Sequence, residues 1–295
     1  NAATLTLASP GASNSLSNSK ALVIDGVIPT VSSVTSTTSN GTYKLGDVIA
    51  ITVSFSETMT VTGTPQLTLE TGSSDAAVNY ASGSGSSTLT FNYTIGAGEA
   101  SSDLDYASTS ALALNGGTIK DGAGNAATLT LASPGATNSL GANKALVVDG
   151  IVPTVSSVTS TTSNGSYKVD EVIAITVTFS EAVTVNTTNG TPQLTLETGS
   201  SDAVVNFASG SGGTTLTFNY TIASGHTSSD LDYASTSALA LNSGTIKDAA
   251  GNSATLTLAT PGQSNSLGAN KALIVDTTVP TISSVNSTAS NGTFK

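Results

Sequence analysis

The 295-residue sequence contains no cysteine, no tryptophan and no arginine, and it has a single histidine. Without cysteine, the chain can form neither disulfides nor Cys-ligated zinc or iron–sulfur sites. Its eight basic residues are all lysines, and nineteen carboxylates bring the formal net charge to −11. Nucleic acids and anionic membranes are bound by excess positive charge, so we expect neither as a partner. An acidic surface attracts cations instead.

Charged and aromatic residues are also scarce: only 9% of the residues are charged and only 4% are aromatic. The hydrophobic fraction is nevertheless 38%, so the polar remainder is mainly Ser, Thr, Asn and Gly. Disordered chains combine low hydrophobicity with high charge, and membrane-spanning chains carry long apolar runs. The composition therefore favours a folded domain outside the membrane.

The dominant feature of the sequence is an internal repeat. The stretch that begins NAATLTLASPGA at Asn1 returns at Asn125 and again, slightly altered, at Asn252. A tandem array of similar units follows. The boundaries predicted before the recurring prolines are a segment 1–28 that ends a preceding repeat, complete repeats at 29–152 and 153–279, and a segment 280–295 that begins a following repeat. We therefore expect the chain to be a window on a longer array, whose neighbouring repeats are its first partners.

Within each repeat, apolar and small polar residues alternate with a period of two, as in VIAITVSF, where Ile49, Ile51 and Val53 share one face. This period predicts half-buried strands. The same alternation predicts strands at PQLTLE, AAVNYA, STLTFNYTI, AATLTL and KALVID, and no stretch shows a helical stripe. Seven or eight short strands in about 125 residues predict an all-β fold of tandem antiparallel β-sandwich domains arranged end to end.

Several motifs recur in order along the whole chain, among them NGTYKLGD, the F-S-E step, D-L-D-Y, D-x-x-G-N and D-x-x-x-P. In these motifs the chain resembles the bacterial immunoglobulin-like or cadherin-like repeats of very large secreted surface adhesins. The resemblance implies a rod of β-sandwiches, stiffened by Ca²⁺ near domain junctions, which holds a tip away from the cell. The stretch LDYAST lacks the Glu that cadherins place soon after L-D, so a full three-ion cadherin site is not implied.

The acidic residues recur almost completely from repeat to repeat, and Ca²⁺ prefers carboxylate and carbonyl oxygens. The candidate metal ligands are Asp103, Asp105, Asp230, Asp232, Asp25, Asp149, Asp276, Glu57, Glu181, Asp121 and Asp248. A hypothesis that unites several of them is a junctional ion bound by Asp149 together with carboxylates of the Glu57 or Asp105 type. Pro153 restricts the backbone just after Asp149, so this junction is expected to be semi-rigid.

Two of the acidic motifs have simpler alternatives. If D-L-D is extended, Asp103 and Asp105 share one face and can both reach one ion, while Leu104 points to the core. The alternative is a solvent-facing pair whose Asp caps a turn. Asp121-Gly-Ala-Gly-Asn125 is first of all a turn signal, because Asp and Asn bond to nearby backbone and Gly supplies positive φ.

Catalysis has little support in the sequence. His226 aligns with Glu99 of the preceding repeat, so it is not a shared catalytic base, and it is expected in a solvent-exposed loop. HExxH, Walker A and GxGxxG motifs are absent, so we predict that the chain is not an enzyme.

The function predicted is a structural extracellular spacer in a bacterial surface adhesin or matrix fibre. One alternative is a filament subunit, in which partial repeats are completed by strand exchange with other copies. Another is a module that binds a glycan or a protein, which would need a patch that one repeat has and its neighbour lacks.

Overall fold

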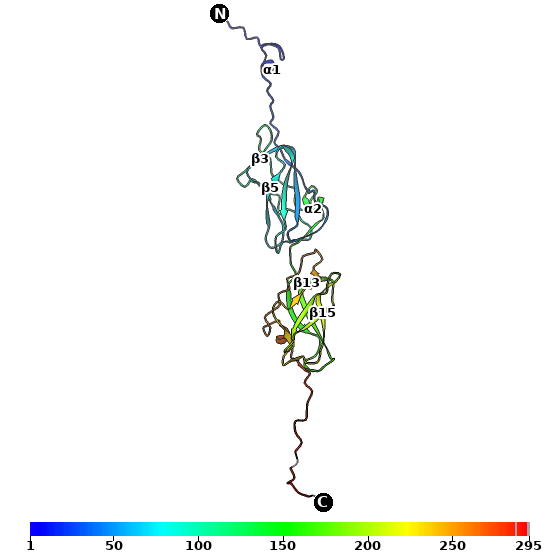
Figure 1. Ribbon diagram of the computed structural model, residues 1–295. Coiled ribbons are helices and arrows are strands. Elements are labelled where there is room, and N and C mark those ends of the chain that lie inside the picture. Colours follow the sequence, from blue (N-terminus) through cyan, green and yellow to red (C-terminus); the bar gives the residue numbers. More distant parts are fainter. Residues whose placement is uncertain (287, 294–295) are drawn as a thin grey trace. The chain divides into compact units, whose positions relative to one another are not determined.

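The computed structural model describes residues 1–286 and 288–293, and the chain divides into two compact units, Asn1–Asp149 and Gly150–Lys295 (Figure 1). The regular secondary structure of each unit is almost wholly β-strand, and the described helices have four residues each. No helix in the described part of the chain is long and apolar enough to span a membrane.

The first unit begins with helix α1 and continues as a series of strands joined by short turns. Its elements are α1 (Leu16–Ser19), β1 (Val31–Ser36), β2 (Gly41–Lys44), β3 (Val48–Thr62), β4 (Gln66–Leu69), β5 (Ala76–Ser82), β6 (Ser86–Thr94), β7 (Ala100–Ser101), β8 (Leu112–Ala113), β9 (Thr118–Lys120), α2 (Leu140–Asn143) and β10 (Leu146–Asp149).

Strand β5 links the two faces of the first unit. Its residues Tyr80 and Ser82 pair with β6, whereas Ala76–Asn79 pair with β4. The strand order is therefore β1-β3-β6-β5-β4-β8, with antiparallel pairing throughout. A smaller sheet has the order β2-β10-β7, and in it β10 runs parallel to β2.

The core lies between these faces and is made by the alternation seen in the sequence. Ile49, Ile51 and Val53 on β3 are fully buried, and so are Leu67 on β4 and Phe91 on β6. Burying one such side chain contributes about 1.5–3 kcal/mol relative to leaving it exposed.

The last part of each unit closes its core, and we call it the closing segment: residues 125–149 in the first unit and 252–276 in the second. In the first unit, Leu131, Leu140, Leu146 and Val148 of this segment are buried in the core cluster. The part that precedes it, 29–124 or 153–251, is called the body.

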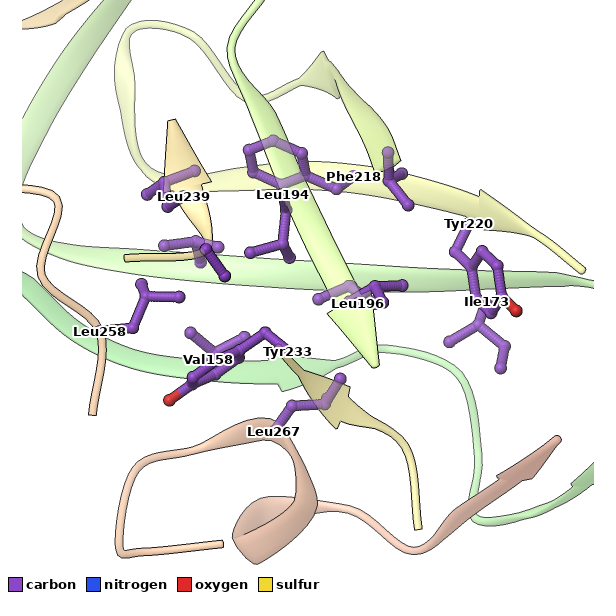
Figure 2. Close-up of a cluster of buried hydrophobic side chains, with 14 of the residues drawn as sticks. Val158, Ile173, Leu194, Leu196, Phe218, Tyr220, Tyr233, Leu239, Leu258 and Leu267 are labelled. Carbon is purple, nitrogen blue, oxygen red and sulfur yellow. The ribbon is translucent and has the colours of Figure 1, made fainter. Parts of the chain in front are cut away.

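The second unit repeats this arrangement. Its elements are β11 (Val155–Ser160), β12 (Gly165–Tyr167), β13 (Val172–Asn186), β14 (Gln193–Glu197), β15 (Ala203–Ser209), β16 (Gly213–Thr221), β17 (Thr227–Ser228), β18 (Asp232–Tyr233), β19 (Leu239–Ala240), β20 (Thr245–Lys247), α3 (Leu267–Asn270) and β21 (Leu273–Asp276). Figure 2 shows its core, where Leu258 and Leu267 of the closing segment point toward side chains such as Val158, Tyr233 and Leu239 of the body.

The structure confirms the fold class, tandem β-sandwich domains of mainly antiparallel sheets, with two local corrections besides the parallel pairing of β10 with β2 and of β21 with β12. AATLTL does not form a strand, because Ala126 and Thr128 make only isolated bridges. The turn before β10 is a short helix, which begins because the Ser139 hydroxyl accepts a hydrogen bond from the Ala142 N–H. A single helical turn is too short to produce a helical period in the sequence.

Candidate metal centre

The structure brings three of the predicted carboxylates of the first unit together. Asp25 precedes Pro29, Glu57 lies on β3, and Asp121 directly follows β9. One oxygen of each side chain lies within 4.8 Å of the oxygens of the other two. They form the acidic triad of the first unit.

The position of Glu57 results from an interruption in strand pairing. The register between β3 and β6 breaks between Ser54 and Met59, so the residues between them leave the regular ladder. Next to Glu57, the Ser56 N–H donates to the Thr30 carbonyl at 2.9 Å, and the Thr30 N–H donates to the Ser56 hydroxyl at 3.1 Å. These two bonds hold the start of the body beside Glu57, which places the residues before Pro29 within its reach.

Asp121 is held rigidly by the turn that follows it. Its Oδ1 accepts hydrogen bonds from the N–H groups of Ala123, Gly124 and Asn125 at 2.7–2.9 Å, and its Oδ2 accepts one from Asn125 Nδ2 at 2.7 Å. Burial raises the pKa of Asp121, but these hydrogen bonds outweigh it, so the pKa is lowered overall. The turn interpretation of D-G-A-G-N is therefore confirmed, and the same turn fixes a charged carboxylate in the triad.

Asp25 is exposed and is oriented by its own backbone. Its Oδ1 accepts a hydrogen bond from the Val27 N–H at 3.0 Å, and its carbonyl oxygen accepts one from Asn125 Nδ2 at 3.2 Å. Asn125 thus connects Asp121 to the segment before Pro29. Sequence reasoning treated Asn125 only as part of a turn, although its recurrence as Asn252 was a visible signal.

Glu57 is the member of the triad with a buried carboxylate oxygen whose negative charge is not offset by a local hydrogen bond. It is half-buried, and its Oε1 is shielded from solvent and accepts no hydrogen bond from the described residues. Burial raises the pKa of Glu57, and the negative charges of Asp25 and Asp121 raise it further. A carboxylate oxygen in this situation fits a bound cation, since Ca²⁺ takes hard oxygen ligands and would offset the repulsion. The three side chains supply oxygen donors alone, which suits Ca²⁺ or Mg²⁺ better than softer metals.

The second unit repeats the surroundings of the triad. Asp248 Oδ1 accepts hydrogen bonds from the Gly251 and Asn252 N–H groups, and its Oδ2 accepts one from Asn252 Nδ2. Glu181 lies in the equivalent break of the β13–β16 register. Asp149 and Asp276 end β10 and β21, and Asp276 Oδ1 accepts a bond from the Thr278 N–H at 2.9 Å.

The D-L-D pair has a different environment. Leu104 and Asp105 are buried, whereas Asp103 is exposed. Asp105 accepts hydrogen bonds from the Tyr106 and Gly135 N–H groups, both at 2.9 Å, and so anchors the loop before α2. In the second unit, Asp232 makes the same two bonds and Asp230 is exposed. Metal ligation by this pair stays a prediction.

Each unit also carries a shallow groove, of about 580 Å³ in the first and 570 Å³ in the second, where β5 leaves β6 and β15 leaves β16. In the first, the Tyr93 hydroxyl donates to Glu99 Oε2 at 2.7 Å. In the second, the Tyr220 hydroxyl lies 2.9 Å from Nδ1 of His226, and the two rings stack. His226 is therefore half-buried and packed on a neighbour, not fully exposed as predicted.

Comparison with known proteins identifies the fold family. Residues 149–261 match the family model described as a bacterial Ig-like domain. Most of the second unit is therefore similar to a bacterial Ig-like domain. Bacterial Ig-like domains are structural modules rather than enzymes, and they are typically extracellular or on the cell surface.

The I-band fragment I67-I69 from titin is similar at 10% sequence identity and a TM-score of 0.31, over 84% of this chain and 66% of that one, so the chain covers just under two thirds of the titin fragment. A comparison with curated proteins gave no match.

Proposed function

We propose that the chain is a segment of an extracellular spacer, made of tandem Ig-like repeats in a bacterial surface adhesin or matrix fibre, and that Ca²⁺ stiffens it near the ends of its units. The observation that carries the proposal is the composition of the acidic triad. Asp25 belongs to the segment before Pro29, whereas Glu57 and Asp121 belong to the body. An ion bound by all three would fasten the entering chain to the body.

The electrostatics of the triad support a cation. Three carboxylates whose oxygens lie within 4.8 Å repel one another, and only Asp121 is compensated by a full set of hydrogen bonds. Ca²⁺ takes six to eight oxygen ligands, so water and backbone carbonyls would complete its shell. When bound, the ion would supply positive charge and fix the backbone of Asp25, while Pro29 restricts its own φ and the conformation of Ile28.

The recurrence of the acidic residues supports one such ion per repeat. By the register of the repeat, Asp149, Glu181 and Asp248 correspond to Asp25, Glu57 and Asp121, and Asp276 begins the next set. A spacer gains length by adding units, so a stiffening device is useful only if every unit carries it.

The proposal includes neither catalysis nor a membrane-inserted part. The single histidine is packed against Tyr220, and its counterpart in the first unit is Glu99, so the two units do not share a catalytic imidazole. The usual location of bacterial Ig-like domains supports the extracellular part of the proposal.

The test is calorimetric titration of the full chain with Ca²⁺, compared with the variant Glu57→Gln/Glu181→Gln. Binding heat and a rise in melting temperature are expected for the wild type and should be lost in the variant. The matched control is Asp75→Asn/Asp202→Asn, which removes the same charge from exposed positions outside the triad and should bind as the wild type does.

Two results would overturn the metal assignment. The first is a wild-type chain that gives no heat and melts at the same temperature in EDTA. The second is equal loss of binding in the control, which would indicate general attraction of cations to an acidic surface.

A further inference from the structure

In each unit, one edge of a large sheet is left open where two strands separate. Strand β5 pairs with β6 at Ser82 and Tyr80, whereas its residues Ala76–Asn79 are paired with β4. Strand β6 continues to Thr94 without a paired residue of β5 beside it. The groove of about 580 Å³ lies at this place, and the exposed residues Asn92 and Thr94 line it.

The backbone of β6 directs polar groups toward this groove. The Thr37 N–H donates to the Ala50 carbonyl at 3.1 Å, and the Ala50 N–H donates to Thr38 Oγ1 at 2.9 Å, so Ala50 bonds on the β1 side of β3. Ala50 is paired with Asn92, and this pair is therefore one of those that do not exchange hydrogen bonds. The N–H and C=O groups of Asn92, and of Thr94 two residues later, point away from β3 and toward the groove.

The second unit is built in the same way. The Thr161 N–H donates to the Ala174 carbonyl at 3.1 Å, and the Ala174 N–H donates to Thr162 Oγ1 at 2.9 Å. Ala174 is paired with Asn219, so the backbone of Asn219 and Thr221 faces the second groove. Among the described residues, no strand pair joins Thr94 or Thr221 to a strand on the groove side. An open edge of this kind can accept another strand.

Two carboxylates line the first groove. Asp75 directly precedes β5 and is exposed, and Glu99 is half-buried in the same groove. Both hydrogen bonds that Glu99 accepts, from the Tyr93 hydroxyl and the Gly96 N–H, go to its Oε2. Its Oε1 is left for a ligand. No lysine is among the residues that line this groove, so its charged side chains are all negative.

The second groove has the same strand edge but a different charge. Asp202 corresponds to Asp75, whereas His226 takes the place of Glu99. The Nδ1 atom of His226 lies 2.9 Å from the Tyr220 hydroxyl, and the two rings stack. A module that recognises a partner needs a patch that one repeat has and its neighbour lacks, and the two grooves meet this condition.

We propose that the groove of the first unit binds an extended, lysine-containing segment of a partner protein. The segment adds a strand to β6 at Asn92 and Thr94, and its lysine enters between Asp75 and Glu99. Strand addition takes affinity from backbone hydrogen bonds and specificity from side-chain contacts. The open strand edge favours a peptide over a glycan, because a glycan lacks the regular N–H and C=O groups that match it. The second groove binds the same segment more weakly, since His226 replaces a carboxylate.

The experiment uses the full chain and a synthetic probe, the capped heptapeptide Thr-Val-Thr-Lys-Thr-Val-Thr. Its β-branched residues favour an extended backbone. Fluorescence anisotropy of the labelled probe should show saturable binding, which is weakened about tenfold or more when glutamate replaces the lysine. Hydrogen exchange followed by mass spectrometry should slow at residues 92–94 more than at residues 219–221.

Modified probes test the strand geometry. Successive residues of an added strand direct their N–H groups to opposite sides, so only alternate residues bond to β6. N-methylation of the two valines and N-methylation of the two inner threonines should therefore differ: one change should weaken binding about tenfold and the other only slightly. Equal effects of the two changes would overturn strand addition.

Variants of the chain test the charges. Glu99→Gln/Asp75→Asn should weaken binding about fivefold, because both charges are lost while glutamine still accepts the hydrogen bond of the Tyr93 hydroxyl. The matched control is Glu57→Gln/Glu181→Gln, which removes two charges outside the grooves and should bind the probe as the wild type does. An equal loss in the control would indicate general attraction of lysine to an acidic chain and overturn the proposal.

The second groove offers a gain of binding. His226→Glu should give it the charge of the first, so that exchange at residues 219–221 slows with the probe as it does at 92–94. Unchanged exchange at 219–221 in this variant would contradict the role assigned to the carboxylate. A wild-type chain that does not bind the probe, or that is protected at 92–94 by a neutral oligosaccharide but not by the probe, would overturn the proposal as a whole.

Discussion

The two units share strands, core and acidic residues, but their grooves differ. In the first, Glu99 Oε2 accepts hydrogen bonds from the Tyr93 hydroxyl and the Gly96 N–H, both at 2.7 Å. In the second, His226 Nδ1 takes this place beside Tyr220. The fold therefore requires a polar partner for the buried tyrosine at this position and accepts either a carboxylate or an imidazole. The triad residues, by contrast, keep the same type in both units.

The largest change in stability is expected for substitutions in the closing segments, which should affect the two units equally. Leu140→Ala and Leu267→Ala should each lower the stability of their own unit by about 2–5 kcal/mol, because both side chains are fully buried. Leu16→Ala, at the corresponding position of residues 1–25, should change stability by less than about 0.5 kcal/mol. Hydrogen exchange followed by mass spectrometry resolves the two units, and a large cost at Leu16 would contradict the structure.

The next effect is expected for substitutions of glycine in the turn between β5 and β6 and in the equivalent turn of the second unit. Gly83 has a φ of 110°, and an added Cβ would clash with the Thr88 carbonyl; Gly210 and Thr215 stand in the same relation. Gly83→Ala and Gly210→Ala should each cost about 1–3 kcal/mol or more, measured by urea unfolding. Gly85→Ala, with a φ of 87° but open space around the Cβ, is the matched control and should cost less. Equal costs at the two turn positions, 83 and 85, would show that strain rather than contact dominates.

Substitutions in the two grooves should lower stability by a smaller amount. Glu99→Ala and His226→Ala should each cost about 1–3 kcal/mol, since each removes a partner of a buried tyrosine hydroxyl. The exchanges Glu99→His and His226→Glu should be better tolerated, because each puts into one unit the residue that the other uses. If either exchange costs more than its alanine variant in chemical unfolding, the two grooves are not interchangeable.

The ionisation of Tyr106 and Tyr233 should make the stability of the two units depend on pH. Burial, and then the charge of Asp105, raises the pKa of Tyr106 to about 12, and Tyr233 beside Asp232 behaves in the same way. The unfolded side chains ionise near 10, so stability should fall as the pH rises from 10 toward 12. Tyr106→Phe and Tyr233→Phe should each weaken this fall in their own unit. A fall that is unchanged in the double variant would mean that other groups cause it.

Much of the fold can be predicted from the sequence, because the alternation of apolar and polar residues indicates which side chains of a strand are buried. The buried positions of β3, Ile49, Ile51 and Val53, follow the period of two, and Leu104 points inward as predicted. AATLTL alternates equally well but makes only isolated bridges, to Lys120 of β9 and to Thr30, and local pattern does not encode pairing.

The acidic triad was only partly predictable for the same reason. Sequence reasoning joined the junctional Asp to carboxylates of the Glu57 or Asp105 type. The structure places Asp25 near Glu57 and Asp121, while Asp105 anchors the loop before α2. The choice between them depends on the register break in β3 and on the Thr30–Ser56 contact, which are tertiary features.

The most direct test is a crystal structure of this chain determined from crystals grown with Ca²⁺. The account predicts an ion bound by Asp25, Glu57 and Asp121, with Ca²⁺–oxygen distances of about 2.3–2.6 Å. An ion held by Asp103 and Asp105 instead, or a triad that holds water alone in saturating Ca²⁺, would contradict it.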